Sequence, residues 1–298
     1  METNGKSRRG VARLTAVWIL GLLALLSCNL LNDAPSDDYE DGISTGNAVA
    51  DKLFNENSAV ISWMGATDAP IESFAADVEI WTMYDTDRSG PVETSRYRLR
   101  VKETDGALSV RMDMDPAFND GDTMSILSDI GEMIMFDTVT EEIRFRIPVP
   151  IDASMDLPYL KAETGISRIN LSNIRLEAEA SAFDIVEDTQ ELLVLMLPTS
   201  LFTGLFGSER ISTRVVFDVP SETLREIAIE DRLEDGTRVV MTERPVYKNH
   251  EGIPIKVGLI AVIVGEAAAM YHRTTTVELY SRVGINGVPK DVFKLPSE

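Results

Sequence analysis

The sequence predicts an α+β fold in which helices cover the apolar face of an antiparallel sheet. From residue 74 onward, consecutive segments alternate apolar and polar residues with a period of two, and turn sequences separate them. Helical spacing occurs before the first of these segments, and the alternation loosens over residues 156–183, where short helices are expected. Successive strands with one apolar face each form an antiparallel sheet whose apolar face must be covered.

The first 27 residues have the pattern of a bacterial export signal. Four basic residues precede an apolar stretch, "AVWILGLLALLS" (16–27), that is shorter than the roughly 20 residues needed to span a bilayer as a helix. "LLSC" then resembles the lipobox, in which a small residue precedes a cysteine that receives a diacylglyceryl group. Cys28 is the only cysteine, so it cannot form an internal disulfide. We expect Cys28 to be the lipid attachment site; an uncleaved membrane anchor or a chance buried thiol are the alternatives.

Residues 28–47 are expected to form an acidic, flexible tether between the lipidated cysteine and a single domain at 48–298. Asn47 is a candidate N-cap for an amphipathic helix over "AVADKLFNENSAVISWM" that Gly65 ends. The formal net charge of −21 argues against nucleic-acid binding and against direct adsorption to anionic lipid. Contact with a membrane is therefore expected through the acyl group.

The first group of expected strands shares one apolar face. Val78 and Ile80 alternate in "FAADVEIWTMYDTD", Leu99 in "VETSRYRLRVKETDG", and Val110 and Met112 in "ALSVRMDMD". The other face of the second segment is cationic, and "EMIMFDTVTEEIRFRIPV" predicts a hairpin around 137–141.

The second half contains one or two short helices over residues 156–183 and then more strands. "ISTRVVFDVPSETLREIAIEDRLEDGTRVVMTE" has turn signals at 220–221 and 234–236. "KVGLIAVIVG" is apolar without alternation, which indicates a buried central strand with helix on one face and cavity contents on the other.

The segment "MLPTSLFTGLFGSER" combines loop punctuation with four large apolar residues: Leu201, Phe202, Leu205 and Phe206. One interpretation is a short helix that plugs the sheet, because the spacing of these residues is helical. The other is a flap at the rim of a lipid cavity, or a wedge towards the membrane, because exposed apolar loops meet apolar partners.

Residues with catalytic or metal-binding potential show no supporting arrangement. Neither of the two histidines, His250 and His272, has a second histidine at metal-ligand spacing, and no nucleophile elbow, P-loop or dinucleotide-binding motif occurs. We therefore expect no enzyme activity, no metal and no cofactor; an envelope hydrolase has only the general frequency of enzymes in its favour.

Several segments between residues 48 and 296 follow one another in a family-specific order. After the amphipathic helix come "SDIGEMIMFDTVTEEI", "ELLVLMLP", "FDVPSETLREIAIEDRLEDGTRVVMTE", "YKNHEGIPIKVGLIAV" and "VELYSRVGINGVPKDVFKLP". In this order they resemble the LolA/LolB superfamily of outer-membrane lipoprotein-sorting carriers, which also includes the regulator RseB; Cys28 places the chain with its lipid-anchored members.

The resemblance implies a curved antiparallel unclosed β-barrel, or half-barrel, with helices covering the concave face and an apolar cavity for acyl chains. The chain would then be an envelope lipoprotein that binds the acyl chains of lipids or lipoproteins and helps to transfer them to the outer membrane. The cavity and flap residues would be Val78, Ile80, Leu99, Val110, Met112, Leu201, Phe202, Leu205 and Phe206. An RseB-like sensor or scaffold that binds an envelope protein partner is the alternative.

The expected location is the periplasmic side of the cell envelope. Asn29, which follows Cys28, differs from the aspartate that retains lipoproteins in the inner membrane of enteric bacteria, and this favours the outer membrane.

Overall fold

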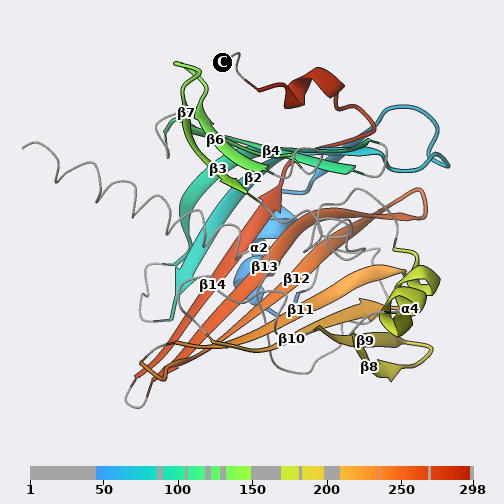
Figure 1. Ribbon diagram of the computed structural model, residues 1–298, viewed down its shortest axis with the longest axis vertical. Coiled ribbons are helices and arrows are strands. Elements are labelled where there is room, and N and C mark those ends of the chain that lie inside the picture. The colour runs from blue at the N-terminus through green and yellow to red at the C-terminus, as the bar shows by residue number, and fades with distance from the viewer. Residues whose placement is uncertain are drawn as a thin grey trace, which may run out of the picture.

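The computed structural model describes residues 45–85, 90–104, 107–117, 122–127, 132–148, 169–180, 183–197, 209–233, 235–267 and 270–295. Strands dominate this part of the chain, with two α-helices and one 3₁₀-helix beside them (Figure 1). The helices are α2 (Ala48–Glu56), α4 (Leu171–Ala180) and the 3₁₀-helix η3 (Lys290–Phe293).

The strands before α4 are β1 (Val60–Trp63), β2 (Ser73–Tyr84), β3 (Val92–Thr104), β4 (Ala107–Met114), β5 (Asp122–Leu127), β6 (Glu132–Asp137) and β7 (Ile143–Pro148). The strands after α4 are β8 (Asp184–Asp188), β9 (Leu192–Leu197), β10 (Glu209–Asp218), β11 (Thr223–Arg232), β12 (Arg238–His250), β13 (Ile253–Ala267), β14 (Met270–Tyr280) and β15 (Arg282–Ile285).

All the strands belong to one sheet, in the order β7-β6-β5-β4-β3-β2-β14-β13-β12-β11-β10-β9-β8. Neighbours on this path are antiparallel, and the pairing of β14 with β2 joins the early strands to the late ones. β15 pairs with β2, and β1 pairs with β15 in parallel, so the sheet is mixed. β7 and β8 are the two ends of this path, so among the described strands the sheet is not closed.

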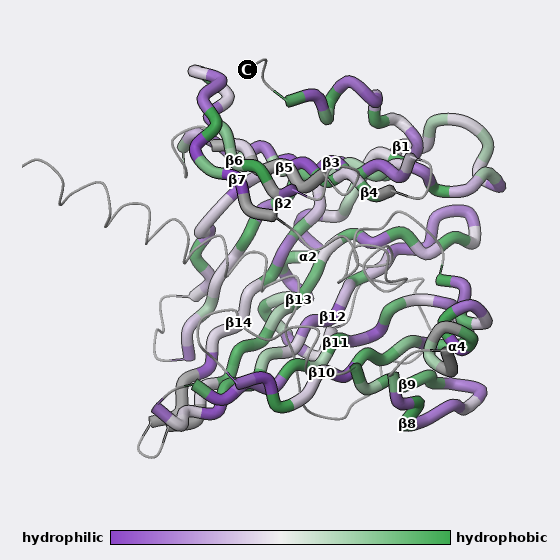
Figure 2. The backbone as a smooth tube through the Cα atoms, viewed as in Figure 1, coloured by the Kyte–Doolittle hydropathy of each residue, from purple (hydrophilic) through white to green (hydrophobic). Residues whose placement is uncertain are grey.

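The register gives the sheet two unlike faces. Leu99 of β3 pairs with Met112 of β4, and Val78 pairs with Tyr280, so these four side chains share what we term the apolar face. The opposite face, which we term the charged face, carries Asp77, Arg98 and Asp113. Each of them is the chain neighbour of a residue on the apolar face. The same period of two gives the mixture of hydrophobic and hydrophilic residues along the strands in Figure 2.

The α-helix α2 packs on the side of the charged face. Asn47 caps it by accepting hydrogen bonds from the backbone N–H groups of Val49 and Ala50. Its Phe54 ring lies against Gly258 of β13, and Gly258 pairs with Leu279, which pairs with Glu79 on the charged face.

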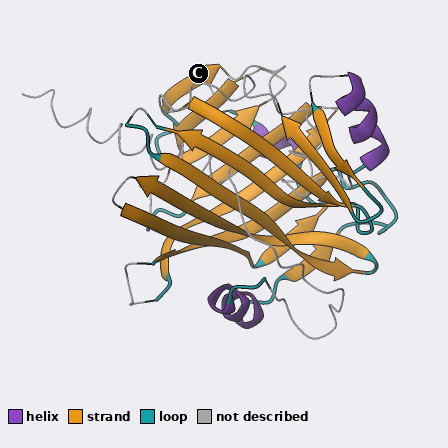
Figure 3. Cartoon of the chain, turned by 90° about the horizontal axis from the view of Figure 1, so that it is seen from below, coloured by secondary structure: helices purple, strands orange, loops and turns teal. Residues whose placement is uncertain are grey.

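The helix α4 packs on the apolar face at the far end of the sheet. Ile174 and Ala178 of this helix cluster with Leu195, Val215 and Ile229 of β9, β10 and β11. Figure 3 shows the two α-helices on opposite sides of the sheet. Each helix therefore covers only a small part of one face.

The predicted fold class, an α+β half-barrel with helices covering the concave face, is wrong. The described chain is mostly β, its sheet is a large mixed one that does not close, and its helices cover neither face. The physical reason is length: α2 and α4 have 9 and 10 residues, whereas β13 alone has 15. A helix of three turns is about 15 Å long and cannot roof a sheet of this width.

The first helix is also shorter than predicted. It ends at Glu56, where the Asn57 side chain donates a hydrogen bond to the Leu53 carbonyl oxygen at 2.9 Å. The remainder of the predicted helix forms β1, whose β-branched and aromatic residues favour a strand, and whose partner is β15. The N-cap at Asn47, the hairpin at 137–141 and the turn at 220–221 are confirmed.

Candidate functional site

Five of the predicted ligand-binding residues lie together on the apolar face. Val78 and Ile80 are on β2, Leu99 is on β3, and Val110 and Met112 are on β4. Leu99 pairs directly with Met112, so the three strands present one continuous surface. Val78, Leu99, Val110 and Met112 are buried, and Ile80 is half-buried. Whether they contact a ligand stays a prediction, and Cys28, Leu201, Phe202, Leu205 and Phe206 lie outside the described residues.

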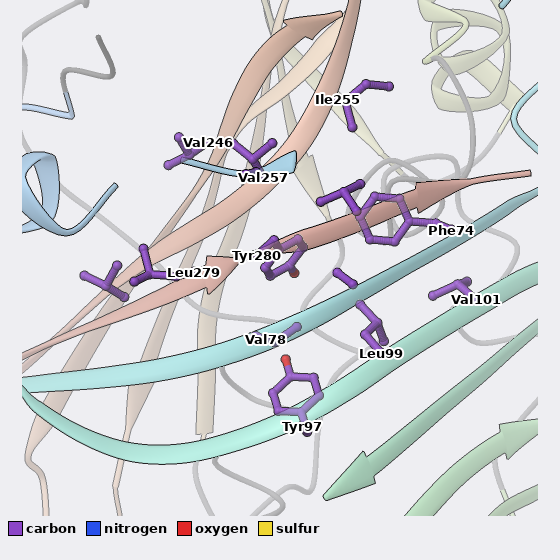
Figure 4. Packing of buried hydrophobic residues seen from close by; sticks show 14 of the residues in the cluster. Phe74, Val78, Tyr97, Leu99, Val101, Val246, Ile255, Val257, Leu279 and Tyr280 are labelled. Atoms are coloured by element: carbon purple, nitrogen blue, oxygen red, sulfur yellow. The ribbon is translucent and has the colours of Figure 1, made fainter. Parts of the chain in front are cut away.

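The surrounding cluster joins β2, β3 and β4 to the other half of the sheet. Phe74 and Tyr280 pack with their ring centres 6.0 Å apart and their planes tilted by 55°. Figure 4 shows Val78, Tyr97, Leu99 and Tyr280 within this cluster. Burial of these side chains is the main favourable contribution to the stability of this half, since each large apolar side chain contributes about 1.5–3 kcal/mol when buried.

Apolar surface reaches solvent at a second set of positions on the same face. Ile80, Met114 and Phe145 are only partly buried and pack against the cluster. Met114 pairs with Tyr97, and Phe145 pairs with Met135, which places both on the apolar face. No described helix lies on the apolar face over β2, β3 and β4.

Ionisable side chains interrupt the apolar face beside Val78, and sequence reasoning missed them. Glu278, Tyr280 and Lys256 are 4%, 3% and 2% exposed. The Tyr280 hydroxyl donates to Glu278 Oε2 at 3.3 Å, and the Lys256 ammonium lies 5.7 Å from the centre of the Tyr280 ring. Glu243 of β12 is fully buried on the same face.

Burial of ionisable groups is costly and is offset by partners within the protein, here the Tyr280 hydroxyl on Glu278 and the Tyr280 ring beside Lys256. The signal in the sequence was a charged residue between two apolar ones near the end of a strand, Glu278 between Val277 and Leu279 in "TTTVELY". The group gives the apolar face one polar point close to its centre, next to the predicted lining residue Val78.

The charged face is held by ion pairs. Asp77 pairs with Arg98 and Arg282, and Arg100 and Arg111 both pair with Asp113. Burial lowers the pKa of Arg111, and burial together with the neighbouring cations lowers the pKa of Arg100. Asp113 therefore holds Arg100 and Arg111 against the sheet, whereas Arg98 and Arg282 pair with Asp77 at the surface.

The C-terminal segment is fixed on the same face. Arg111 donates to the Val292 carbonyl oxygen at 2.7 Å and lies 5.4 Å from the centre of the Phe136 ring. Lys102 donates to the Val288 carbonyl oxygen at 2.9 Å. Figure 1 shows η3 above β4, on the side away from the later strands.

Histidines and carboxylates of the described residues form no metal site. No group of three or more His, Cys, Asp and Glu side chains in that part of the chain is placed to hold a metal ion. His250 instead stacks on Trp63, with ring centres 6.2 Å apart. Among the described helices, none has the length and apolar character that a membrane crossing requires.

Comparison with known proteins gives little. No family model matches the chain, and no curated protein matches it. Among solved structures, a chain of the Pseudomonas aeruginosa MucA/MucB complex is similar, with 9% sequence identity and a TM-score of 0.23 over 70% of this chain and 88% of that one. A structural similarity this weak does not support an inference about function.

Proposed function

We propose that the chain is an envelope lipoprotein, anchored through Cys28, whose apolar sheet face binds the acyl chains of lipids or of other lipoproteins. Transfer of lipoproteins to the outer membrane would be its cellular role, without enzyme activity. The observation that carries the proposal is the apolar face over β2, β3 and β4, which no described helix covers and at whose border Ile80, Met114 and Phe145 are partly exposed.

The energetics of acyl binding fit such a surface. Burial of hydrocarbon contributes about 0.8 kcal/mol per CH₂, so a long acyl chain supplies roughly 10 kcal/mol before the entropy cost of binding is subtracted. This energy scales with the apolar area covered and requires no particular polar contact. A strand surface with Val, Leu, Ile and Met side chains meets that requirement, and methionine adapts to ligands of different shape.

The test begins with protein purified from membranes. Native mass spectrometry should detect co-purifying lipid, and delipidated protein should take up a dansyl-labelled undecanoic acid with an increase in fluorescence. Failure of both measurements would refute the proposal.

A matched pair of variants locates the site. Ile80 and Met83 are partly buried residues of the same strand on opposite faces. Ile80→Gln should weaken uptake of the fatty acid about five- to tenfold, since half-burial of such a side chain is worth about 1 kcal/mol. Met83→Gln should leave the affinity unchanged; equal losses in both variants would show that the apolar face is not the binding surface.

A sensor or scaffold that recognises a protein partner is the second candidate. The observation in its favour is that Val78, Leu99, Val110 and Met112 are between 0% and 7% exposed, so their own neighbours already pack against them. If this candidate is right, delipidated protein will keep its full stability and bind no fatty acid.

A further inference from the structure

The last strand of the sheet, β8, is exposed along its whole length. Each of its five residues is exposed, including the apolar Ile185 and Val186 at 37% and 61%. Within the described part of the chain, β9 is its only strand neighbour, so the other edge of β8 has no strand beside it (Figure 1). A free edge presents backbone N–H and C=O groups that a further strand can pair with.

The edge is held in place by its own contacts. Asp184 and Ile185 pair with Met196 and Leu195 of β9, and the ladder resumes at Glu187 after Val186 as an extra residue. At the end of the strand, Asp188 accepts two hydrogen bonds from the Arg175 guanidinium of α4, at 2.9 and 2.7 Å. An added strand would therefore meet an edge that needs little further ordering.

Charge selects the kind of strand that fits. β8 has the sequence "DIVED", and Glu191 follows in an exposed turn. Arg175 neutralises Asp188. The side chains of Asp184 and Glu187 are exposed to solvent, and in the sequence they flank the exposed Ile185 and Val186. Complementary charge favours a basic partner and speeds its association.

We propose that the free edge of β8 binds an extended basic segment of another protein as an added strand. Backbone hydrogen bonds would supply affinity, and Asp184 and Glu187 would select Arg or Lys at alternate positions. This function is separate from acyl binding, because it uses the sheet edge and not the apolar face.

A second copy of the chain is a poor partner for this edge. Two acidic edges repel each other, and the whole chain has a net charge of −21. The opposite free edge, β7, carries Arg144 and Arg146, but these already pair with Asp137 at 2.7 Å and Glu132 at 3.3 Å.

Acidic residues and a bulge on an edge strand also protect proteins from aggregation. The two explanations predict different binding. A protective edge rejects every strand, whereas a docking edge accepts a basic one.

The experiment uses the full chain and three fluorescein-labelled octapeptides, measured by fluorescence anisotropy. The first alternates Arg and Val, the second has Glu in place of each Arg, and the third is the Arg–Val peptide with every backbone nitrogen methylated. The Arg–Val peptide should bind at least tenfold more tightly than the N-methylated peptide, since the latter has no backbone N–H group to donate to β8, and the Glu peptide should not bind.

Matched variants separate the edge from overall charge. Asp184→Lys with Glu187→Lys should weaken binding of the Arg–Val peptide about tenfold, as expected for two surface charges. Glu141→Lys with Glu142→Lys makes the same charge change in the exposed β6–β7 turn and should have little effect. The inference is overturned if the N-methylated peptide binds equally well, if both double variants lose the same affinity, or if no peptide binds. It is also overturned if sedimentation shows that the native chain is a dimer and the Asp184→Lys/Glu187→Lys variant is a monomer.

Discussion

Gly258 provides a sharp test of how α2 is seated on the sheet. A Cβ atom at this position would lie less than 3 Å from the Glu278 carbonyl oxygen and from the Phe54 ring, including 2.8 Å from Phe54 Cζ. The ring can turn, but the carbonyl oxygen belongs to β14, which is paired with β13 on one side and β2 on the other. Gly258→Ala should therefore force strand and helix apart.

The expected cost follows from this geometry. Overpacking of a well-packed core costs typically about 1–3 kcal/mol, and the backbone contact places this variant near 3 kcal/mol. For a chain of this size, each kcal/mol lowers Tm by roughly 2–4 °C, so a decrease of about 6–12 °C is expected. Phe54→Ala alone should cost about 3–5 kcal/mol, because it leaves a cavity.

The assay is urea unfolding followed by circular dichroism, with Gly265→Ala as the control. Gly265 lies on the same strand, and a Cβ there would meet no atom within 4 Å. This control should stay within about 0.5 kcal/mol of the native chain. The double variant Gly258→Ala/Phe54→Ala should cost about 1 kcal/mol less than the sum of the two single variants, because removing the ring relieves one of the two contacts.

Two results would refute this reasoning. If Gly258→Ala is as stable as Gly265→Ala, then α2 does not lie against β13 as described. If the double variant is strictly additive, the Phe54 ring does not contribute to the clash and the carbonyl oxygen alone accounts for the loss.

Three further predictions concern the polar contacts of the sheet. Backbone N–H groups of Thr140 and Val139 and the Arg144 guanidinium lower the pKa of Asp137 from 3.8 to about 2, with Thr140 the largest contribution. Because the folded pKa is the lower one, this stabilisation is present above pH 3.8 and is lost as the pH falls through about 2; Asp137→Asn should therefore show a flatter decline of stability over that range in acid titration. Asn286 has a positive φ of 58°, accepts hydrogen bonds from the Glu72 and Ser73 N–H groups and donates one to the Pro70 carbonyl oxygen. Asn286→Ala loses these hydrogen bonds and should lower the free energy of unfolding by about 1–3 kcal/mol. Asn286→Gly loses the same bonds but adopts the positive φ without strain, so it should lower the free energy of unfolding less. Arg111→Lys should speed amide hydrogen exchange in η3 without affecting β10, because lysine cannot reach Asp113 and Val292 together.

The strand faces of the first half could be predicted from the sequence because their alternation is regular. The sequence predicts a cationic face on "VETSRYRLRVKETDG", and its Arg96, Arg98 and Arg100 do lie on the charged face. Side chains alternate between the two faces of a strand, so assigning one residue to a face assigns all the others, whichever strand is the partner. The hairpin at 137–141 was predictable for a similar reason, since turn chemistry is local.

Long-range pairing was not predictable from local patterns. The residues of β1 continue a helical spacing, and their parallel partner β15, far along the chain, adds to their β-branched and aromatic composition in favouring a strand. The prediction that helices cover the apolar face was wrong. The alternation of apolar and polar residues shows that this face must be covered, but it does not identify the segments that cover it. Glu278 and Tyr280 lie two positions apart on β14, but Lys256 belongs to β13, and only the pairing of these two strands brings it beside them.

The pairing of β1 with β15 has a consequence for biogenesis. Glu72 and Asn286 are bonded across 214 positions of sequence, in the same region where the earliest and latest strands meet. At about 5–20 residues per second, a ribosome needs roughly 10–40 s between making the two halves of this seam. Until residue 286 is available, β1 lacks the strand it pairs with in the folded domain, and pairing across so long a stretch of sequence makes completion of the sheet slow.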